Sequence, residues 1–349
     1  MARKRICVYG HFAFGKELLN GQTIKTKIIT EQLINEFGKD QVMLEDTGNR
    51  WKTLFRMPFQ LWRIIGQCDN LVILPAYKGV RVMVSLLALY SILGHKTTVH
   101  YAIIGAWLPT FIDSKKYLAL SLKHVDYMYA ETQTMLKALN ERGYYNVQLM
   151  PNCKDIRIIS EDEFPSRNVT PLKLCTFSRV MRQKGIDDIV SVIRRINDRH
   201  GETVFTLDIF GPIFRGEDEW FNRTSRDFPE YIRYGGPVAS ENSVNTLKDF
   251  FLLIFPSRFY TEGVPGTIID AFAAGLPALS VHWESFDDVV DEGVNGISYP
   301  FGDNEALERE LEKIAGNPDI VYSLKPACLK KAHEFKPQNI IRTLVLNIR

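Results

Sequence analysis

The sequence predicts an α/β protein of two domains, each with a parallel sheet covered by helices. Short apolar runs typical of buried strands alternate with longer stretches of helical periodicity along the chain. A chain of 349 residues is too long for one compact core, which also favours two domains. Residues 150–171 contain three prolines and several charged side chains, and they are the best candidate for the linker between the two domains.

The expected strands divide between the two halves. The first half has runs at 6–9, 42–44, 70–74, 97–104 and 127–130, and the second at 172–177, 203–210, 232–234, 251–255, 278–281 and 296–299. Residues 325–349 read as helical, with a break near Pro337. We therefore expect domains at 1–160 and 161–330, followed by a C-terminal helix at 331–349.

Composition points to a globular, cytosolic protein. Apolar residues make up 45% of the chain, and five cysteines show no C-x-x-C pair, which favours reduced thiols and no zinc site. The N-terminal residues do not form a convincing signal peptide. The longest apolar segment, 82–93, is too short to cross a bilayer and is expected to be a buried helix.

Charge is unevenly distributed along the chain. Residues 1–150 hold 19 Lys+Arg against 11 Asp+Glu, whereas the remainder hold 24 against 30. Within the basic half, aromatic and basic side chains interleave over residues 51–63, a pattern that suits an anionic membrane surface. The alternative is a core-facing helix with solvated arginines. Nucleic acid is not expected, because no recognition motif is present.

The N-terminal segment has a strand, a glycine-containing loop at 11–22 and a helix at 23–37 that Gly38 ends. Strand, glycine-rich loop and helix are the elements that cradle phosphate groups. Neither the G-x-G-x-x-G nor the P-loop pattern occurs, so a dinucleotide or nucleoside-triphosphate fingerprint is absent from the sequence.

The most informative stretch is 261–277. Glu262 lies in a loop, a turn with two glycines follows, and a helix is expected at 267–274 with Asp270 in its first turn and Gly275 at its end. Backbone N–H groups at such a helix start bind anions such as diphosphates, while carboxylates suit sugar and ribose hydroxyls. The alternative is an ordinary strand–loop–helix connection.

These residues resemble the Glu-x7-Glu signature of retaining family 4 glycosyltransferases. The chain matches the consensus at Glu262, Gly263, Pro265, Ala271, Ala273, Gly275 and Pro277, and departs from it at Asp270, where the family has Glu. Upstream, Arg179 and Lys184 keep the spacing of the family's G-R-x-x-x-x-K-G segment, with Ser178 in place of the first glycine. By itself this segment could be a solvated basic turn.

The resemblance implies the glycosyltransferase B fold: two facing, doubly wound, Rossmann-like domains with the active site in the cleft between them. It covers the second half well and the first half loosely. The second domain would bind the nucleotide sugar and the first the acceptor. The C-terminal helix would return to the first domain.

The resemblance also implies roles for individual residues. Arg179 and Lys184 would hold the donor diphosphate, Glu262 the donor sugar and Asp270 the ribose; Glu262, Arg179 and Lys184 form the expected catalytic set. The expected donor-binding set is Gly21, Gln22, Arg179, Lys184, Glu262, Gly263, Val264, Pro265, Gly266, Thr267 and Asp270.

No metal or other cofactor is expected, because the two cations and the helix start would replace a metal. The acidic clusters 217–219 and 287–288 are interpreted as solvated loops. Many relatives carry a histidine near the reacting sugar. His100, inside a strand, and His11, after the first strand, are the candidates, and no general base is assigned.

The expected function is transfer of a hexose, with retention, from a nucleoside-diphosphate sugar to a glycan or lipid-linked acceptor in bacterial polysaccharide assembly. The expected location is the cytoplasm or the inner face of the membrane, reached through 51–63. Two alternatives remain: a nucleotide-sugar epimerase of the same fold, and a non-catalytic partner subunit.

Overall fold

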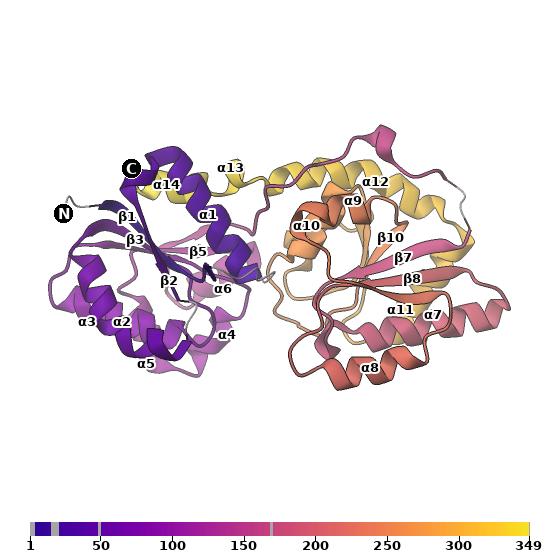
Figure 1. The fold of residues 1–349 in the computed structure, drawn as a ribbon, viewed down its shortest axis with the longest axis horizontal. Coiled ribbons are helices and arrows are strands. Elements are labelled where there is room, and N and C mark those ends of the chain that lie inside the picture. Colours follow the sequence, from indigo (N-terminus) through magenta and orange to yellow (C-terminus); the bar gives the residue numbers. More distant parts are fainter. Residues whose placement is uncertain (1–3, 15–20, 48–49, 168–169, 349) are drawn as a thin grey trace. The chain divides into compact units, whose positions relative to one another are not determined.

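The computed structural model describes residues 4–14, 21–47, 50–167 and 170–348, with the side chains of 50–54 excepted. Contacts divide the chain into two units. The first comprises 1–155, 261–264 and 335–349, and the second 156–260 and 265–334. Each unit has its own six-stranded parallel sheet (Figure 1). The predicted α/β fold with two Rossmann-like domains is confirmed.

The first sheet has the strand order β2-β1-β3-β4-β5-β6. Its strands are β1 (Lys4–Gly10), β2 (Val42–Asp46), β3 (Cys68–Ile73), β4 (Thr98–Ala102), β5 (Tyr127–Ala130) and β6 (Val147–Leu149). Five of them overlap the predicted runs. β6 was not predicted, because three residues are too few to show a periodic pattern.

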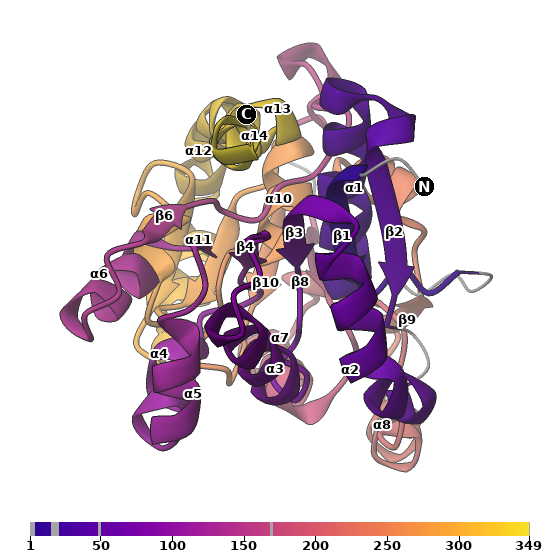
Figure 2. The same ribbon diagram turned by 90° about the vertical axis from the view of Figure 1, so that its left-hand side faces the viewer.

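Helices cover both faces of the first sheet (Figure 2). The helices are α1 (Gly21–Phe37), α2 (Arg50–Ile65), α3 (Val80–Ile92), α4 (Leu108–Asp113), α5 (Lys116–Leu122), α6 (Gln133–Glu141), α13 (Pro337–Ile340) and α14 (Arg342–Ile348). Alternate residues of β1 face opposite cores: Cys7 and Tyr9 pack with the side chains of α2 to α6, and Ile6 and Val8 with those of α1, α13 and α14. Near-continuous apolar strands are what a sheet covered on both faces requires.

The second sheet has the strand order β12-β11-β10-β7-β8-β9. Its strands are β7 (Leu172–Phe177), β8 (Phe205–Phe210), β9 (Ile232–Gly236), β10 (Leu252–Phe255), β11 (Ala278–Val281) and β12 (Gly296–Tyr299), all overlapping predicted runs. Its helices are α7 (Ile186–His200), α8 (Asp218–Arg226), α9 (Ser243–Leu247), α10 (Gly266–Ala273), α11 (Asn304–Gly316) and α12 (Asp319–Ala332). α7 packs against α11, and α10 packs against α12 (Figure 1).

The C-terminal residues belong to the first unit. The predicted break falls at Pro337, the first residue of α13, where a missing N–H costs no helical hydrogen bond. Leu344 and Ile348 of α14 are buried in the core that contains Ile6 and Val8. Asn347 Nδ2 donates to Tyr129 Oη at 3.0 Å and to Gln148 Oε1 at 2.8 Å. These contacts fix α14 on the first sheet.

Two of the element boundaries that differ from the expectation concern predicted site residues. Gly21 and Gln22 are the first residues of α1 and not the end of a loop, while residues 15–20 of that loop lie outside the described residues. α10 begins at Gly266, one residue earlier than predicted, so Asp270 is its fifth residue and lies beyond the first turn. Gly275 follows α10 with a φ of 61°, the left-handed conformation expected at a helix end.

Candidate active site

The two central strands of the second sheet place the predicted site segments at one edge. β7 and β10 are neighbours, and the chain continues from β7 to one side of the sheet and from β10 to the other. Ligands bind parallel sheets at such a reversal of strand order, beyond the carboxyl ends of the strands. Arg179 and Lys184 follow β7, and the segment leading into α10 follows β10. The fold thus brings both motifs of the second half to this edge.

Direct contacts join the two segments. Thr267 Oγ1 donates to the carbonyl of Phe177, the last residue of β7, and Arg258 N–H donates to Gln183 O at 2.8 Å. Gly185 has a φ of 65°, and a Cβ there would lie 2.1 Å from Pro256 O. Only glycine fits this approach, because any side chain would collide with the backbone after β10.

Lys184 is a buried cation. It is 8% exposed, and its Nζ lies 5.1 Å from the ring centroid of Phe255 and 5.2 Å from that of Phe259. Aromatic faces attract a cation, and the attraction is stronger when water is excluded. The solvated-turn interpretation is therefore wrong for Lys184. Arg179 fits it better: this residue is exposed, with its guanidinium carbon 5.4 Å from the ring of Phe214.

The start of α10 lies at the same edge. Pro265 occupies the N-cap and has no polar side chain that could cap the helix. The first backbone N–H groups of a helix have no acceptor within it, and with the helix dipole they favour an anion at this end. Gly266 and Thr267 therefore form a helix start that favours an anion, beside the end of β7.

Asp270 is buried, with 2% of its surface exposed, and its Oδ1 accepts a hydrogen bond from Ser243 Oγ at 3.1 Å. Ser243 begins α9 and was not among the predicted site residues. The sequence offered no signal for it, since a serine at a helix start is most often a cap. Ser243 fixes the orientation of the carboxylate within the second unit.

The loop that carries Glu262 has its contacts in the first unit. Val264 N–H donates to Glu131 Oε2 at 3.4 Å, and Asn152 Nδ2 donates to Val264 O at 3.1 Å. Gly263 and Val264 are buried, whereas Glu262 is partly exposed. The sequence analysis missed Glu131 and Asn152. The available signal was their position, because Glu131 directly follows β5 and Asn152 comes shortly after β6.

Gly21 and Gln22 lie where the strand order of the first sheet reverses, at β1 and β3. Gln22 Nε2 donates to Leu74 O, directly after β3, at 2.9 Å. A Cβ on Gly10, the last residue of β1, would lie 2.7 Å from Thr26 Cγ2, which shows how closely α1 approaches this strand. The start of α1 is therefore fixed at the carboxyl ends of β1 and β3.

His100 is a structural residue. It is fully buried in β4, and burial lowers its pKa to about 4. Its Nε2 lies 3.0 Å from Asn70 Oδ1 and its Nδ1 lies 3.0 Å from Tyr129 Oη. Because Asn70 Nδ2 donates to Arg5 O, Asn70 Oδ1 is the acceptor, so Nε2 carries the proton and Nδ1 accepts from Tyr129. His11, the other candidate, lies 4.0 Å from Asp46.

Within the described ranges, no group of three or more His, Cys, Asp and Glu side chains converges as metal ligands would. In the acidic clusters, Glu217 pairs with Arg182 at 3.4 Å and Asp287 with His282 at 3.4 Å. The five cysteines are buried and unbridged, and burial raises the pKa of Cys7 and Cys175. None of the helices in the part of the chain that the structure describes combines the length and apolar composition of a membrane span.

Sequence relatives match about half of this chain. The amylovoran biosynthesis glycosyltransferase AmsK of Erwinia amylovora is 24% identical over 182 residues, and the alpha-monoglucosyldiacylglycerol synthase of Acholeplasma laidlawii is 29% identical over 191 residues. The matches cover 50% and 54% of this chain and 44% of each relative. The chain thus spans less than half the length of these relatives.

Solved structures match the whole chain. The galactosyltransferase WaaB of the lipopolysaccharide outer core has a TM-score of 0.70 and 16% identity, covering 97% of this chain and 98% of its own. HepE from Anabaena, in complex with UDP and glucose, has a TM-score of 0.74 and 13% identity, covering 99% of both chains. These likenesses establish the glycosyltransferase B fold.

The family model described as glycosyl transferases group 1 matches residues 171–317. This range contains β7 to β12 and the predicted residues Arg179, Lys184 and Asp270. Residues 171–317 therefore form a domain of the group 1 glycosyl transferases, on a chain that has the glycosyltransferase B fold.

Proposed function

We propose that the protein transfers a hexosyl group, with retention of configuration, from a nucleoside-diphosphate sugar to a glycan or lipid-linked acceptor. The observation that carries the proposal is the meeting of Lys184, Arg179 and the start of α10 at the carboxyl ends of β7 and β10. Two cations and a helix start suit a diphosphate. The names of the relatives support a role in polysaccharide or glycolipid assembly.

In the proposed reaction, the bond from the anomeric carbon to the donor phosphate breaks and a bond to the acceptor oxygen forms on the same face. The leaving phosphate oxygen takes the acceptor proton. Negative charge grows on the diphosphate, and Arg179 and Lys184 stabilise it more in the transition state than in the ground state. These cations take the place of a divalent metal. Gly21 and Gln22, at the start of α1 in the first unit, are further proposed donor-binding residues.

The two carboxylates have separate proposed roles. Glu262, partly exposed on its loop, accepts hydrogen bonds from donor-sugar hydroxyls near the reacting carbon. Asp270, whose Oδ1 accepts a hydrogen bond from Ser243, binds a ribose hydroxyl of the donor. Because Asp is one methylene shorter than the Glu of the resembling family, the ribose must lie closer or a water must bridge.

The experiment that tests this function starts from a thermal-shift screen of UDP-, GDP-, ADP- and dTDP-sugars. The stabilising donor is then incubated with and without glycan and lipid-linked acceptors, and the anomeric configuration of the product is determined by NMR. An inverted product would overturn retention. An epimerised nucleotide sugar without acceptor would identify the epimerase, and donor binding without turnover would identify the non-catalytic subunit.

We further propose that the first unit binds the anionic, inner face of a membrane through α2. This helix has two apolar stripes. Met57, Leu61 and Ile64 are buried in the core, while Phe55, Phe59 and Trp62 are 77%, 81% and 51% exposed, at i, i+4 and i+7. A second apolar stripe exposed to water is unusual for a helix at the surface of a single globular unit.

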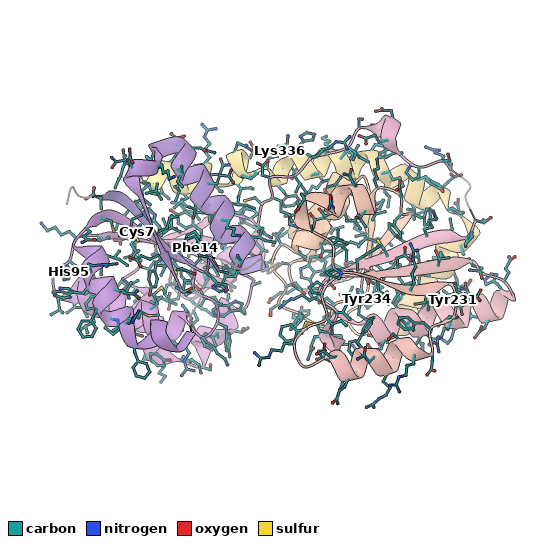
Figure 3. The ribbon with its side chains drawn as sticks, in the orientation of Figure 1. Cys7, Phe14, His95, Tyr231, Tyr234 and Lys336 are labelled. Carbon is teal, nitrogen blue, oxygen red and sulfur yellow. The ribbon has the colours of Figure 1, made fainter. Side chains whose placement is uncertain are left out.

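Neighbouring residues extend this surface. Trp62 packs edge-on against His95, and their ring centroids are 4.5 Å apart. His95, labelled in Figure 3, lies just after α3. Leu89, Ile92 and Leu93 are exposed there. Between residues 51 and 100 the sequence has six basic residues and one acidic residue, which favours anionic lipid as the occupant. The side chains of 51–54 lie outside the described residues.

A further inference from the structure

Lys25 and Glu131 form a buried ion pair that the proposed reaction does not use directly. Nζ lies 2.6 Å from Oε1, and the side chains are 2% and 5% exposed. Lys25 lies on α1, and its Nζ also donates to Ile103 O at 2.9 Å, while Glu131 directly follows β5. Burying two charges is costly, and only a well-bonded geometry offsets the lost hydration. The pair therefore holds the carboxylate in one orientation.

The second oxygen of Glu131 contacts the loop that carries Glu262. Oε2 accepts from Val264 N–H at 3.4 Å, and a Cβ on Gly263 would lie 2.2 Å from the same oxygen and 3.1 Å from Gly105 Cα. The carboxylate thus lies directly against the loop backbone, and a side chain at position 263 would displace it. Both oxygens of Glu131 are used, one by Lys25 and one by the loop.

We propose that Glu131, held by Lys25, is a positioning residue that fixes the backbone of residues 262–264 and thereby aims Glu262 at the donor sugar. The inference rests on the proposed function, since it assigns a consequence for transfer. Val264 is two residues from Glu262. We therefore expect the loss of the hydrogen bond between Val264 N–H and Glu131 to shift the Glu262 carboxylate. A displacement of about 1 Å at a reacting centre lowers turnover by about a hundredfold.

A matched pair of double variants isolates the hydrogen bond to Val264. Lys25→Met/Glu131→Gln removes both charges and keeps an acceptor for the Val264 amide, whereas Lys25→Met/Glu131→Leu removes both charges and the acceptor. An uncharged pair of similar volume is often as stable as the buried ion pair that it replaces, so both variants are expected to fold. Their difference reports the acceptor and not the buried charge.

Two measurements are made on each variant: hydrogen exchange of the Val264 amide, and kcat and donor KM. In the leucine variant we expect the amide to exchange about tenfold faster, as for one lost hydrogen bond. We expect kcat to fall about tenfold to a hundredfold, with donor KM within about twofold of wild type. The glutamine variant should stay close to wild type in all three. His100→Asn, which disturbs other buried contacts of the first unit, should leave kcat unchanged.

Each outcome decides the proposal. If the Val264 amide exchanges equally fast in the leucine and glutamine variants, Glu131 does not hold this amide. If it exchanges faster in the leucine variant but kcat is the same in both, Glu131 does not position Glu262. A parallel fall in kcat for His100→Asn would reduce the effect to general destabilisation and overturn positioning as well. If the wild-type protein transfers no sugar, the proposed function fails, while the exchange experiment still decides whether Glu131 holds the loop.

Discussion

The two units have similar sheets, but their charged side chains have different contacts at the point where the strand order reverses. In the second unit, Arg179 is exposed and Lys184 lies against aromatic rings, beside the start of α10. In the first unit, the charge of Lys25 is neutralised by Glu131, and the amide of Gln22 is bound to Leu74 O. The edge of the second sheet has two cations beside a helix start, whereas at the edge of the first sheet the described cation Lys25 is held in a buried ion pair.

This difference shows that topology provides a place for a site and side chains provide its chemistry. Both units offer a helix start beyond the carboxyl ends of two central strands. Among the described residues, the second unit has two cations, which follow the neighbouring strand β7, beside that helix start. The proposed diphosphate site therefore lies in the second unit, while the loop at 261–264 has its contacts in the first unit.

The largest effect is expected from the acid that the first unit holds. Glu262→Gln should lower kcat by about a hundredfold or more with little change in donor KM, because it acts near the reacting carbon. Asp270→Asn should mainly raise donor KM, because ribose contacts change little during transfer. Steady-state kinetics with the identified donor measures both. Glu241→Gln, at an exposed acid of the second unit, is the control, and an unchanged kcat in Glu262→Gln would refute the role assigned to Glu262.

The next effect concerns the cations of the second unit. Lys184→Ala and Arg179→Ala should each lower kcat/KM by roughly a hundredfold, the loss expected for one preorganised charge stabiliser. Lys184 should matter more, because its burial reduces screening by water. Lys173→Ala, at an exposed lysine of β7, is the matched control. Wild-type rates in a folded Lys184→Ala protein would refute the proposal that the diphosphate binds at this edge.

A smaller effect is expected in the pH dependence of stability, to which a buried histidine contributes in the first unit. The pKa of His100 is about 4 when folded and about 6.5 when unfolded, so its contribution to stability is complete above pH 6.5 and is lost as the pH falls through 4. By linkage, the free energy of unfolding at pH 5 is about 2 kcal/mol lower than above pH 6.5 on account of this group. Urea unfolding at pH 7.5 and 5 should show a smaller pH-dependent loss in His100→Asn than in wild type. His282→Asn, at an exposed histidine of the second unit, should behave as wild type.

The smallest effect tests the exposed apolar stripe of α2. Binding to anionic liposomes should weaken with salt, and Arg56→Glu should weaken it by about 1–2 kcal/mol, the scale of one reversed charge near the surface. Phe59→Ser should weaken binding at every salt concentration. Arg226→Glu on α8 of the second unit is the control. Equal binding of the wild type to neutral and anionic vesicles would contradict the assignment.

The sequence by itself determined the elements and their type. Apolar runs predicted β5, β7, β11 and β12 to the residue, because a buried strand of a parallel sheet is apolar on both faces. The end of α10 at Gly275 also followed from local chemistry, since glycine adopts a positive φ without strain. The spacing of Arg179 and Lys184 and of Glu262 and Asp270 identified the segments that the fold then placed beside β7 and β10.

Tertiary structure decided what each charged side chain contacts. Lys25 and Glu131 are 106 residues apart, and Glu131 and Val264 are 133 apart. No periodic pattern reports pairs so distant, because strand order alone brings them together. The same holds for the burial of Lys184 against Phe255 and for the assignment of 261–264 to the first unit. Local patterns fix backbone conformation, whereas desolvation and ion pairing depend on which elements pack, and only the folded chain sets that.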